Sequence, residues 1–216
     1  MYSKYDITTA KWGEVKEMGH YDMAILPWGA TEPHNLHLPY CTDMLTAQAV
    51  AFEVAEKAAM QGVNLMVLPG IPLGSQNPGQ IELPYCIHTS QTTQMAILRD
   101  VVRSLKRQGI RKLMIMSGHG GNNFKGIIRD IMIEDPEMII VHNEWFAIIP
   151  RTDYFEEKED DHAGELETSV MLHYYPDLVR MDLAGDGQFS KFGIEGLNTK
   201  VAWLPRDWSK VTQDTG

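Results

Sequence analysis

The sequence predicts a single layered α/β domain over residues 1–216, in which helices cover both faces of a mostly parallel central sheet. Short apolar runs typical of buried strands alternate with longer stretches of helical periodicity. The helical stretches in the crossovers between successive strand-like runs are roughly 10–20 residues long, as expected for parallel strands joined by helices. Neither an internal repeat nor a linker divides the chain, and its length suits one domain.

The first half of the chain predicts two strands around one long helix. The first strand covers residues 23–26, and we expect Pro27 to end it. Residues 43–60 form the helix, because apolar side chains recur at helical spacing and Gly62 follows. Thr42 or Asp43 caps its first turn. The second strand covers residues 64–68 and ends at Pro69-Gly70.

The second half continues the alternation after a loop over residues 71–84, IPLGSQNPGQIELP, which is too rich in breakers to be a simple connection. A helix opens at Thr89 or Ser90 and ends at Gly109. A strand over 113–116 leads through a glycine turn over 117–122 into another helix, which ends by Asp135. A fourth strand covers 138–141, and a helix covers 165–174. The remainder has weak periodicity and receives no assignment.

Composition excludes several classes of function. The formal net charge of −10 argues against a nucleic-acid partner, since that affinity depends on cationic contacts. No apolar run is long enough to span a membrane, and the first residues do not resemble a signal peptide. Cys41 and Cys86 lack metal-site or disulfide spacing, which indicates free thiols and a cytoplasmic protein. The acidic run EEKEDD over 156–161 is expected to be a solvated loop.

Polar side chains gather after the ends of the predicted strands. In open parallel sheets, ligands bind at the carboxyl ends of the strands. These residues are therefore expected to lie in one functional region: Glu32 and His34, the NPGQ loop over 77–80, His119, His142, Glu144 and Trp145.

The segment over residues 28–39 predicts metal ligands. Its prolines keep the backbone extended, so Glu32 and His34 point to the same side. Asp43 follows at the mouth of the next helix. Two carboxylates and an imidazole suit zinc, manganese or iron. The alternative is an ion-paired Glu32, a buried structural His34 and an Asp43 that only caps the helix.

His119 strengthens the metal interpretation, because glycines on both sides let the chain turn sharply while presenting one imidazole. A glycine turn before a helix can also bind an anion. No lysine follows the glycines as a phosphate loop requires, so a metal ligand is the preferred interpretation.

His162 precedes the predicted helix over 165–174 and is a candidate proton donor, since histidine titrates near neutral pH. Glu165 and Glu167 are two positions apart and cannot both enter one site from a helix. Neither the serines nor the cysteines have the sequence context of a covalent nucleophile.

These motifs identify a resemblance to the creatininase (creatinine amidohydrolase) family. Its pattern G-[ST]-x-E-x-H-x-x-H-L-P, followed by T-D, reads here from Gly29 to Pro39 with Thr42-Asp43. Pro78-Gly79, SGHGGN at 117–122 and HAGELETS at 162–169 agree in the same order. The resemblance implies an α/β fold, often a homohexamer, and hydrolysis of C–N bonds in small cyclic or linear amides at one or two divalent metal ions.

Carried over by residue, the resemblance makes Glu32 and His119 ligands of one metal and His34 a ligand of a second, with Asp43 bridging both. His162 would be the proton shuttle. Creatininase has a metal-binding glutamate where this chain has Gly121, so Glu167 or water would complete the second site.

The HGGN sequence also occurs in branches that resemble formamide deformylases and peptidases acting on redox-peptide precursors. Relatives continue beyond the position of Gly216, so the chain is expected to lack a C-terminal segment.

The sequence therefore predicts a metal-dependent amidohydrolase that uses a metal-activated water and zinc, manganese or iron. Candidate substrate contacts are Trp28, Trp145, Gly120 and Asn122, although simple packing is the alternative for the tryptophans. A non-catalytic metal- or metabolite-binding protein and a phosphate-transferring enzyme remain as alternatives from other classes.

Overall fold

The computed structural model describes residues 4–148, 150–157 and 162–215. Residues 158–161, most of the predicted acidic loop, lie outside the described residues. The chain forms two compact units that alternate along the sequence. Unit 1 comprises Met1–Ala30, Asp43–Ser75 and Thr89–Ile148, and unit 2 comprises Thr31–Thr42, Gln76–His88 and Ile149–Gly216. The predicted motifs are thus divided between the units.

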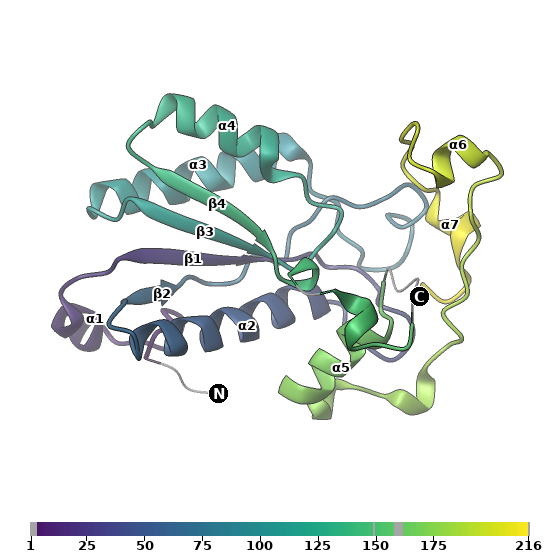
Figure 1. The fold of residues 1–216 in the computed structure, drawn as a ribbon, viewed down its shortest axis with the longest axis horizontal. Helices are drawn as coiled ribbons and strands as arrows, with labels where there is room; N and C mark the ends of the chain where they lie inside the picture. The colour runs from purple at the N-terminus through teal and green to yellow at the C-terminus, as the bar shows by residue number, and fades with distance from the viewer. Residues whose placement is uncertain (1–3, 149, 158–161, 216) are drawn as a thin grey trace. The chain divides into compact units, whose positions relative to one another are not determined.

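Unit 1 contains a four-stranded parallel sheet (Figure 1). Its strands are β1 (Met23–Trp28), β2 (Leu65–Val67), β3 (Lys112–Ser117) and β4 (Ile139–Glu144), in the order β2-β1-β3-β4. The helices are α1 (Trp12–Met18), α2 (Thr42–Ala59), α3 (Gln91–Arg107) and α4 (Phe124–Glu134), and a short 3-10 turn, η1 (Trp145–Ala147), follows β4. Helices α3 and α4 cover one face of the sheet, and α2 lies along the other face. This arrangement confirms the predicted parallel α/β fold class.

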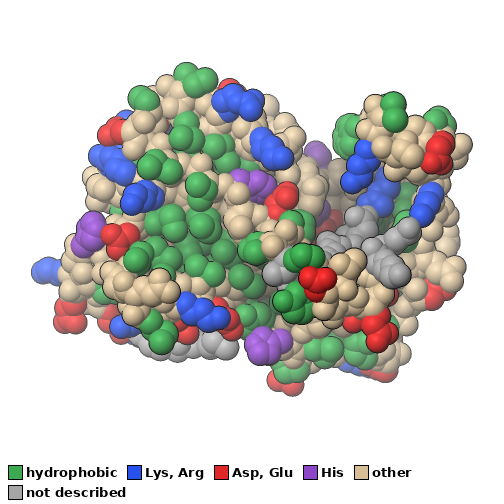
Figure 2. Space-filling model, viewed as in Figure 1, with side chains coloured by type: hydrophobic (Ala, Val, Ile, Leu, Met, Phe, Trp, Pro, Cys, Tyr) green, Lys and Arg blue, Asp and Glu red, His purple; other side chains and the backbone are tan. Residues whose placement is uncertain are grey.

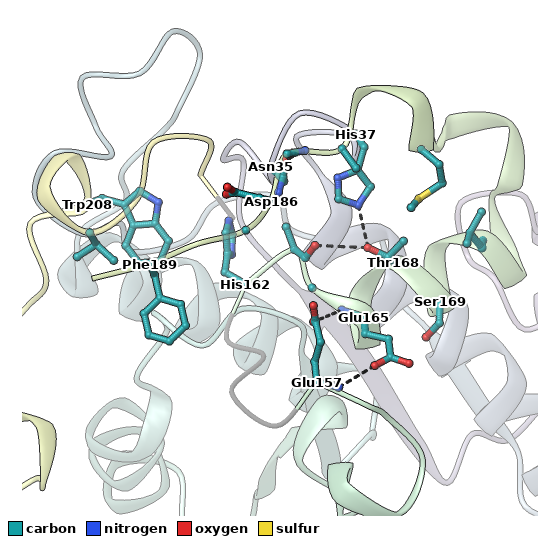
Figure 3. Close-up of a pocket in the computed structure, with 18 of the residues that line it drawn as sticks. Asn35, His37, Glu157, His162, Glu165, Thr168, Ser169, Asp186, Phe189 and Trp208 are labelled. Atoms are coloured by element: carbon teal, nitrogen blue, oxygen red, sulfur yellow. Dashed lines mark hydrogen bonds between the residues drawn. The ribbon is translucent and has the colours of Figure 1, made fainter. Parts of the chain in front are cut away.

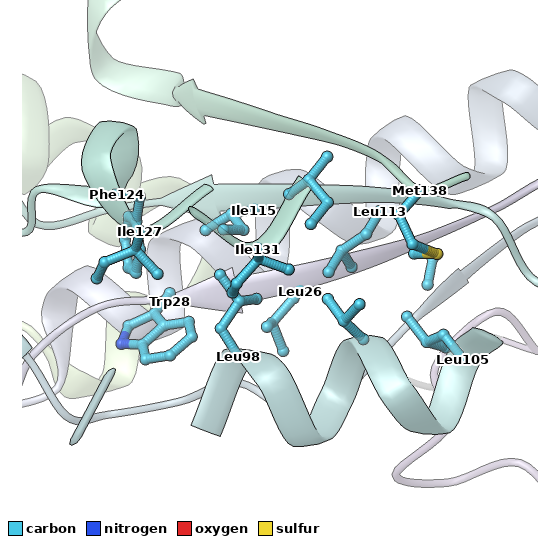
Figure 4. Packing of buried hydrophobic residues seen from close by; sticks show 13 residues of the cluster. Leu26, Trp28, Leu98, Leu105, Leu113, Ile115, Phe124, Ile127, Ile131 and Met138 are labelled. Carbon is cyan, nitrogen blue, oxygen red and sulfur yellow. The ribbon is translucent and has the colours of Figure 1, made fainter. Parts of the chain in front are cut away.

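The main hydrophobic core lies between the sheet and the α3–α4 layer (Figure 4). Alternate residues of β1, β3 and β4 pack against the apolar faces of α3 and α4. Burying one Leu, Ile, Phe or Met side chain contributes roughly 1.5–3 kcal/mol to the free energy of unfolding. Trp28 is fully buried there, with its ring centroid 4.9 Å from that of Phe124. The core therefore fixes the strand ends from which the polar loops leave.

The opposite face of the sheet is covered less completely. Three small residues of α2 are fully buried: Ala47, Ala51 and Ala55. At the edge strand β4, Ile139 and Val141 are half exposed on the face opposite the core. Figure 2 shows a broad hydrophobic area over this part of the sheet.

The first strand is longer than predicted. The expectation that Pro27 ends it was wrong, since β1 continues to Trp28. Its neighbour β2 already ends at Val67, so the N–H that Pro27 lacks does not interrupt the ladder between the two strands. The Pro27 carbonyl accepts a bond from the backbone N–H of Ile71 at 3.0 Å, which holds the start of the long loop against the strand.

Unit 2 consists of α5 (Glu165–Tyr174), two one-turn helices, α6 (Glu195–Asn198) and α7 (Trp208–Val211), and 3-10 turns over Arg151–Asp153 (η2), Pro176–Leu178 (η3) and Met181–Leu183 (η4). Backbone bonds join its distant segments: Arg180 N–H donates to His37 O at 2.9 Å, and Asn35 N–H donates to Thr215 O at 3.2 Å. The segment after α5, unassigned from the sequence, thereby braces the His34 motif.

Among the described residues, no helix combines the length and the apolar character that crossing a membrane requires.

Candidate metal centre

In unit 1, Asp43 and His119 form a close, buried pair. Asp43 lies in the first turn of α2 and is 1% exposed, and His119 follows β3 and is 8% exposed. The Nδ1 atom of His119 lies 3.1 Å from Oδ2 of Asp43. Ligand atoms on one tetrahedral zinc ion are roughly 3.3–3.6 Å apart, because each bond is about 2.0–2.2 Å long. The pair is therefore within a few tenths of an ångström of the spacing of two ligands of one metal.

A backbone carbonyl sets the orientation of the His119 ring. Its Nε2 lies 2.7 Å from the Ser75 carbonyl oxygen, which can only accept, so Nε2 carries the hydrogen. In neutral imidazole, Nδ1 then presents its lone pair to the Asp43 carboxylate. Either a proton on Nδ1 or a bound cation relieves the repulsion between these two electron-rich atoms, and both atoms are good ligands for a divalent metal.

The Asp43 carboxylate also bears on the alternative anion site. A negative charge beside the glycine turn repels phosphate, so the geometry disfavours the predicted alternative of an anion cradle at 117–122.

Glycines bring Asp43 against the strand ends. A Cβ atom at Gly118 would collide with the Asp43 carbonyl, and one at Gly29 would collide with the backbone of Asp43 and Met44. Only a residue without a side chain allows the start of α2 to lie directly on these turns. The glycines that follow β1 and β3 therefore position the carboxylate.

Gly121 has a similar steric role. A Cβ atom there would overlap His119 Nε2 and the Ser75 carbonyl, the two atoms of the orienting hydrogen bond. A glutamate at this position, as creatininase has by the resemblance above, does not fit this arrangement. The loop carbonyl of Ser75 occupies the space instead.

In unit 2, two imidazoles face one carboxylate. His34 Nε2 and His162 Nδ1 each lie 4.0 Å from Oε1 of Glu32, and the two imidazole ring centroids are 4.3 Å apart. Glu32 and His34 are almost fully buried, whereas His162 is partly exposed. One ligand atom from each of the three residues lies within 4.8 Å of the others.

Backbone carbonyls orient these rings too. His34 Nδ1 donates to Glu32 O at 3.0 Å, and His162 Nε2 donates to Pro33 O at 2.8 Å. The nitrogens left with lone pairs, His34 Nε2 and His162 Nδ1, are the ones that face Glu32. The predicted same-side arrangement of Glu32 and His34 is thereby observed.

Gln80 holds Glu32 from the other side. Its side-chain amide donates to Oε2 of Glu32, and Gln80 is 2% exposed. The sequence indicated a functional loop at NPGQ but did not identify Gln80 as a partner of Glu32, because the two residues are 48 positions apart.

Glu167 and Glu165 have separate roles, as the two-residue spacing predicted. Glu167 Oε2 accepts the backbone N–H of Ala163 at 2.6 Å, and a Glu167 carboxylate oxygen lies within 4.8 Å of a His34 ring nitrogen. Glu165 instead accepts the backbone N–H groups of Glu156 and Glu157. Glu167 is therefore the glutamate on the His34 side.

A strained residue follows His162. Ala163 has a φ of 53°, unusual for a residue with a side chain, and is buried. Its carbonyl accepts a bond from Thr168 Oγ1 at 3.4 Å, and Thr168 in turn contacts His37 Nε2 at 2.9 Å. Burial, followed by the nearby His34, lowers the pKa of His37, so His37 is a neutral partner in this network.

Of the remaining predicted contacts, three are buried and Gly120 is exposed: the buried ones are Trp28, Asn122 and Trp145. For Trp28, the structure supports packing: it lies in the core and its Nε1 donates to Leu73 O at 2.7 Å. Asn122 is buried, and its side-chain oxygen accepts hydrogen bonds from the Ser75 backbone N–H and from Gln94 Nε2. Gly120 is exposed, and Trp145 is 9% exposed in η1 after β4.

The fold and the two donor sets, one within each unit, define an α/β protein with candidate ligands for divalent metal ions. The chain belongs to the creatininase family of hydrolases, because the family model described as creatinine amidohydrolase matches residues 8–216.

Individual proteins support this membership. A solved structure of a candidate creatinine amidohydrolase from Bacteroides fragilis is 55% identical with a TM-score of 0.97, covering 100% of this chain and 85% of that one. Creatinine amidohydrolase from Pseudomonas putida is 30% identical over 181 residues, 75% of this chain and 68% of the relative. Mycofactocin precursor peptide peptidase from Mycolicibacterium smegmatis is 30% identical over 162 residues, 74% of this chain but only 61% of the relative.

Solved creatininases contain the metals that the donor sets favour. A zinc–zinc form of a glutamate-to-glutamine variant is 27% identical with a TM-score of 0.74, and a manganese form is 26% identical with a TM-score of 0.71. Each match covers 88% of this chain and 80% of the other.

Proposed function

We propose that this protein is a metal-dependent amidohydrolase that cleaves a C–N bond other than a peptide bond in a small cyclic or linear amide. The observation that carries the proposal is the orientation of the imidazoles: backbone carbonyls hold one nitrogen of each ring, and the other nitrogen faces Asp43 or Glu32. Family membership supports the same chemistry.

By the family resemblance, we assign Glu32 and His119 to one divalent ion, His34 to a second, and Asp43 to both. Glu167 supplies the carboxylate on the His34 side, in the place of the glutamate that Gly121 replaces. Zinc, manganese or iron, when bound, would polarise the substrate carbonyl and lower the pKa of a water molecule.

His162 moves the proton. Because Nε2 donates to Pro33 O, Nδ1 is the atom that accepts a proton from the attacking water and passes it to the leaving nitrogen. The water oxygen bonds to the carbonyl carbon, the C–N bond breaks, and an acid and an amine leave. Expulsion of the amine needs this proton, since an unprotonated amide nitrogen is a poor leaving group.

The names of the relatives do not fix the substrate. They include a creatinine amidohydrolase and a peptidase, and a deformylase from Methanothermobacter marburgensis that is 26% identical over 192 residues. Gly121 separates this chain from creatininase at one proposed ligand, so we propose the amidohydrolase reaction without choosing creatinine.

The test is hydrolysis of a panel of formamides, acetamides and cyclic amides by protein purified without chelator. The proposal predicts turnover that disappears on chelation and returns with zinc or manganese. A metal-loaded protein that cleaves none of them would instead be a non-catalytic binding protein.

We further propose a cytoplasmic homohexamer. The hexamer comes from the family resemblance, and the cytoplasmic location from two cysteines that, among the described residues, form no disulfide. Light scattering coupled to gel filtration measures the subunit count, and a monomer would contradict the hexamer.

A further inference from the structure

Unit 2 contains a pocket of about 500 Å³ beside His162 (Figure 3). Of the residues proposed for metal binding and proton transfer, only His162 lines it. The other walls come from the 35–37 segment, the start of α5 and the chain from Met181 to Val211. The segment from Met181 to Val211 takes no part in the proposed hydrolysis.

The position of His162 connects the pocket to the reaction. Its Nδ1 faces Glu32, while its ring forms part of the pocket wall. The group that gives a proton to the leaving nitrogen therefore borders the space into which the rest of the leaving amine can extend.

One side of the pocket is aromatic and aliphatic. Trp208 is 5% exposed and meets the His162 ring edge-on, with centroids 5.4 Å apart. Phe189 lies beside it in Figure 3, and Leu172, Met181 and Val211 add aliphatic surface. A cavity of about 150 Å³ accommodates benzene, so this pocket has room for a phenyl ring with an attached chain.

The charged groups of the pocket favour a cation over an anion. Carboxylates come from Glu157, Glu165 and Asp186, whereas Arg206 is the guanidinium among the described lining residues and lies 4.8 Å from the centre of the Trp208 ring. An ammonium group gains from the excess of negative charge, and a carboxylate loses.

We propose that the pocket binds the amine half of the substrate, as an aromatic or aliphatic group on the leaving nitrogen that is neutral or cationic rather than anionic. This inference rests on the proposed hydrolysis for its biological meaning. Phe189 and Trp208 select for size and apolar character, and Asp186 selects against negative charge.

The test measures binding of product-like probes by ligand-detected NMR titration of metal-loaded protein. The probes are phenethylamine, its neutral analogue 2-phenylethanol, and the anion 3-phenylpropionate. We expect saturable binding of phenethylamine and at least roughly tenfold weaker binding of the anion. Equal binding of the amine and the anion, or no saturable binding of the amine, would overturn the proposal.

Variants locate the binding site. Phe189→Ala should weaken phenethylamine binding on the order of tenfold, because the amine loses its aromatic contact. Phe192→Ala, in the same segment but outside the pocket lining, should leave the affinity unchanged. Asp186→Asn should reduce the difference in affinity between phenethylamine and 3-phenylpropionate. Equal loss in the two phenylalanine variants would contradict binding in this pocket.

The amide panel separates this inference from the proposed function. The pocket proposal would be rejected, and the hydrolase proposal kept, if kcat/KM for N-phenethylformamide were no higher than kcat/KM for N-methylformamide. Saturable binding of phenethylamine without hydrolysis of any amide would reject the hydrolase while leaving the pocket as a binding site for amines.

Discussion

The two donor sets differ in how tightly they are built. In unit 1, His119 and Asp43 are 3.1 Å apart, and the backbones of neighbouring glycines lie directly against both residues. In unit 2, His34 and His162 each lie 4.0 Å from Glu32, and His162 borders a pocket. Rigid support favours metal affinity, whereas proton transfer requires access to substrate. The unit 1 pair is therefore suited to anchoring an ion, and His162 of the unit 2 cluster is suited to proton transfer.

The largest effect on rate alone should come from His162. Replacing it with alanine removes the proton donor while leaving Glu32, His34, Asp43 and His119 in place. We expect turnover to fall about 10²–10⁴-fold with metal content unchanged. The measurement is kcat together with metal analysis, and His173→Ala, an exposed histidine on α5, is the control.

A substrate series sharpens this result. The loss of turnover in His162→Ala should be smaller for amides whose leaving nitrogen is already acidic, since these amides need less protonation. His162→Asn with wild-type turnover would show that the side chain only supports the start of α5.

Gly121 tests the rigidity of the unit 1 pair. A Cβ atom there displaces the Ser75 carbonyl from His119 Nε2, so Gly121→Ala should reduce metal affinity roughly 10–100-fold, the usual range for loss of a partner that orients a ligand. Gly120→Ala is the matched control, because a Cβ atom at that position meets no atom within 4 Å. Equal affinities of the two variants in a competition titration would contradict a role for the Ser75–His119 bond.

Substitution of Glu167 tests the proposed second metal site, on the His34 side. We expect two metal ions to bind in sequence, with the second held more weakly and removed first by chelator. Glu167→Gln should weaken this second step several-fold to about tenfold, and Glu165→Gln, whose carboxylate contacts the loop backbone, should not. Two tight, indistinguishable sites in titrations of Glu167→Gln would mean that another residue completes the ligand shell.

The smallest effect concerns stability and pH. Burial lowers the pKa of His142, which packs on Phe124 at the end of β4. Below about pH 6.5 the unfolded chain binds a proton at this residue that the folded chain does not, so stability is lost as pH falls. His142→Gln should flatten this decline in urea unfolding of metal-free protein between pH 7.5 and 5.5. An unchanged slope, equal to that of His173→Gln, would contradict the assignment.

Side-chain periodicity predicted the scaffold well. The expected helix at 43–60 is α2, and the expected strands at 64–68, 113–116 and 138–141 match β2, β3 and β4 to within one residue, except that β4 extends three residues further. The helix α1 was not predicted, because it has only seven residues and none of them is buried. The segment after α5 has no regular period, since isolated backbone bonds rather than long elements hold it.

The candidate ligands were predictable because their residue types are chemically distinctive. Their supports were not, because the carbonyls of Ser75, Pro33 and Glu32 that orient the three imidazoles belong to the backbone and carry no signature in the sequence. Gly121 shows the same limit: its importance lies in the atoms that a Cβ would displace.

Metal content tests the central claim most directly. Protein purified without chelator should contain between one and two equivalents of zinc, manganese or iron by elemental analysis. Asp43→Ala should lose most of it, because the proposed bridging carboxylate serves both ions. Thermal unfolding of Asp43→Asn, which keeps the side-chain shape, checks that the fold survives. Metal-free wild-type protein that does not take up zinc, or full metal retention in Asp43→Ala, would contradict the account.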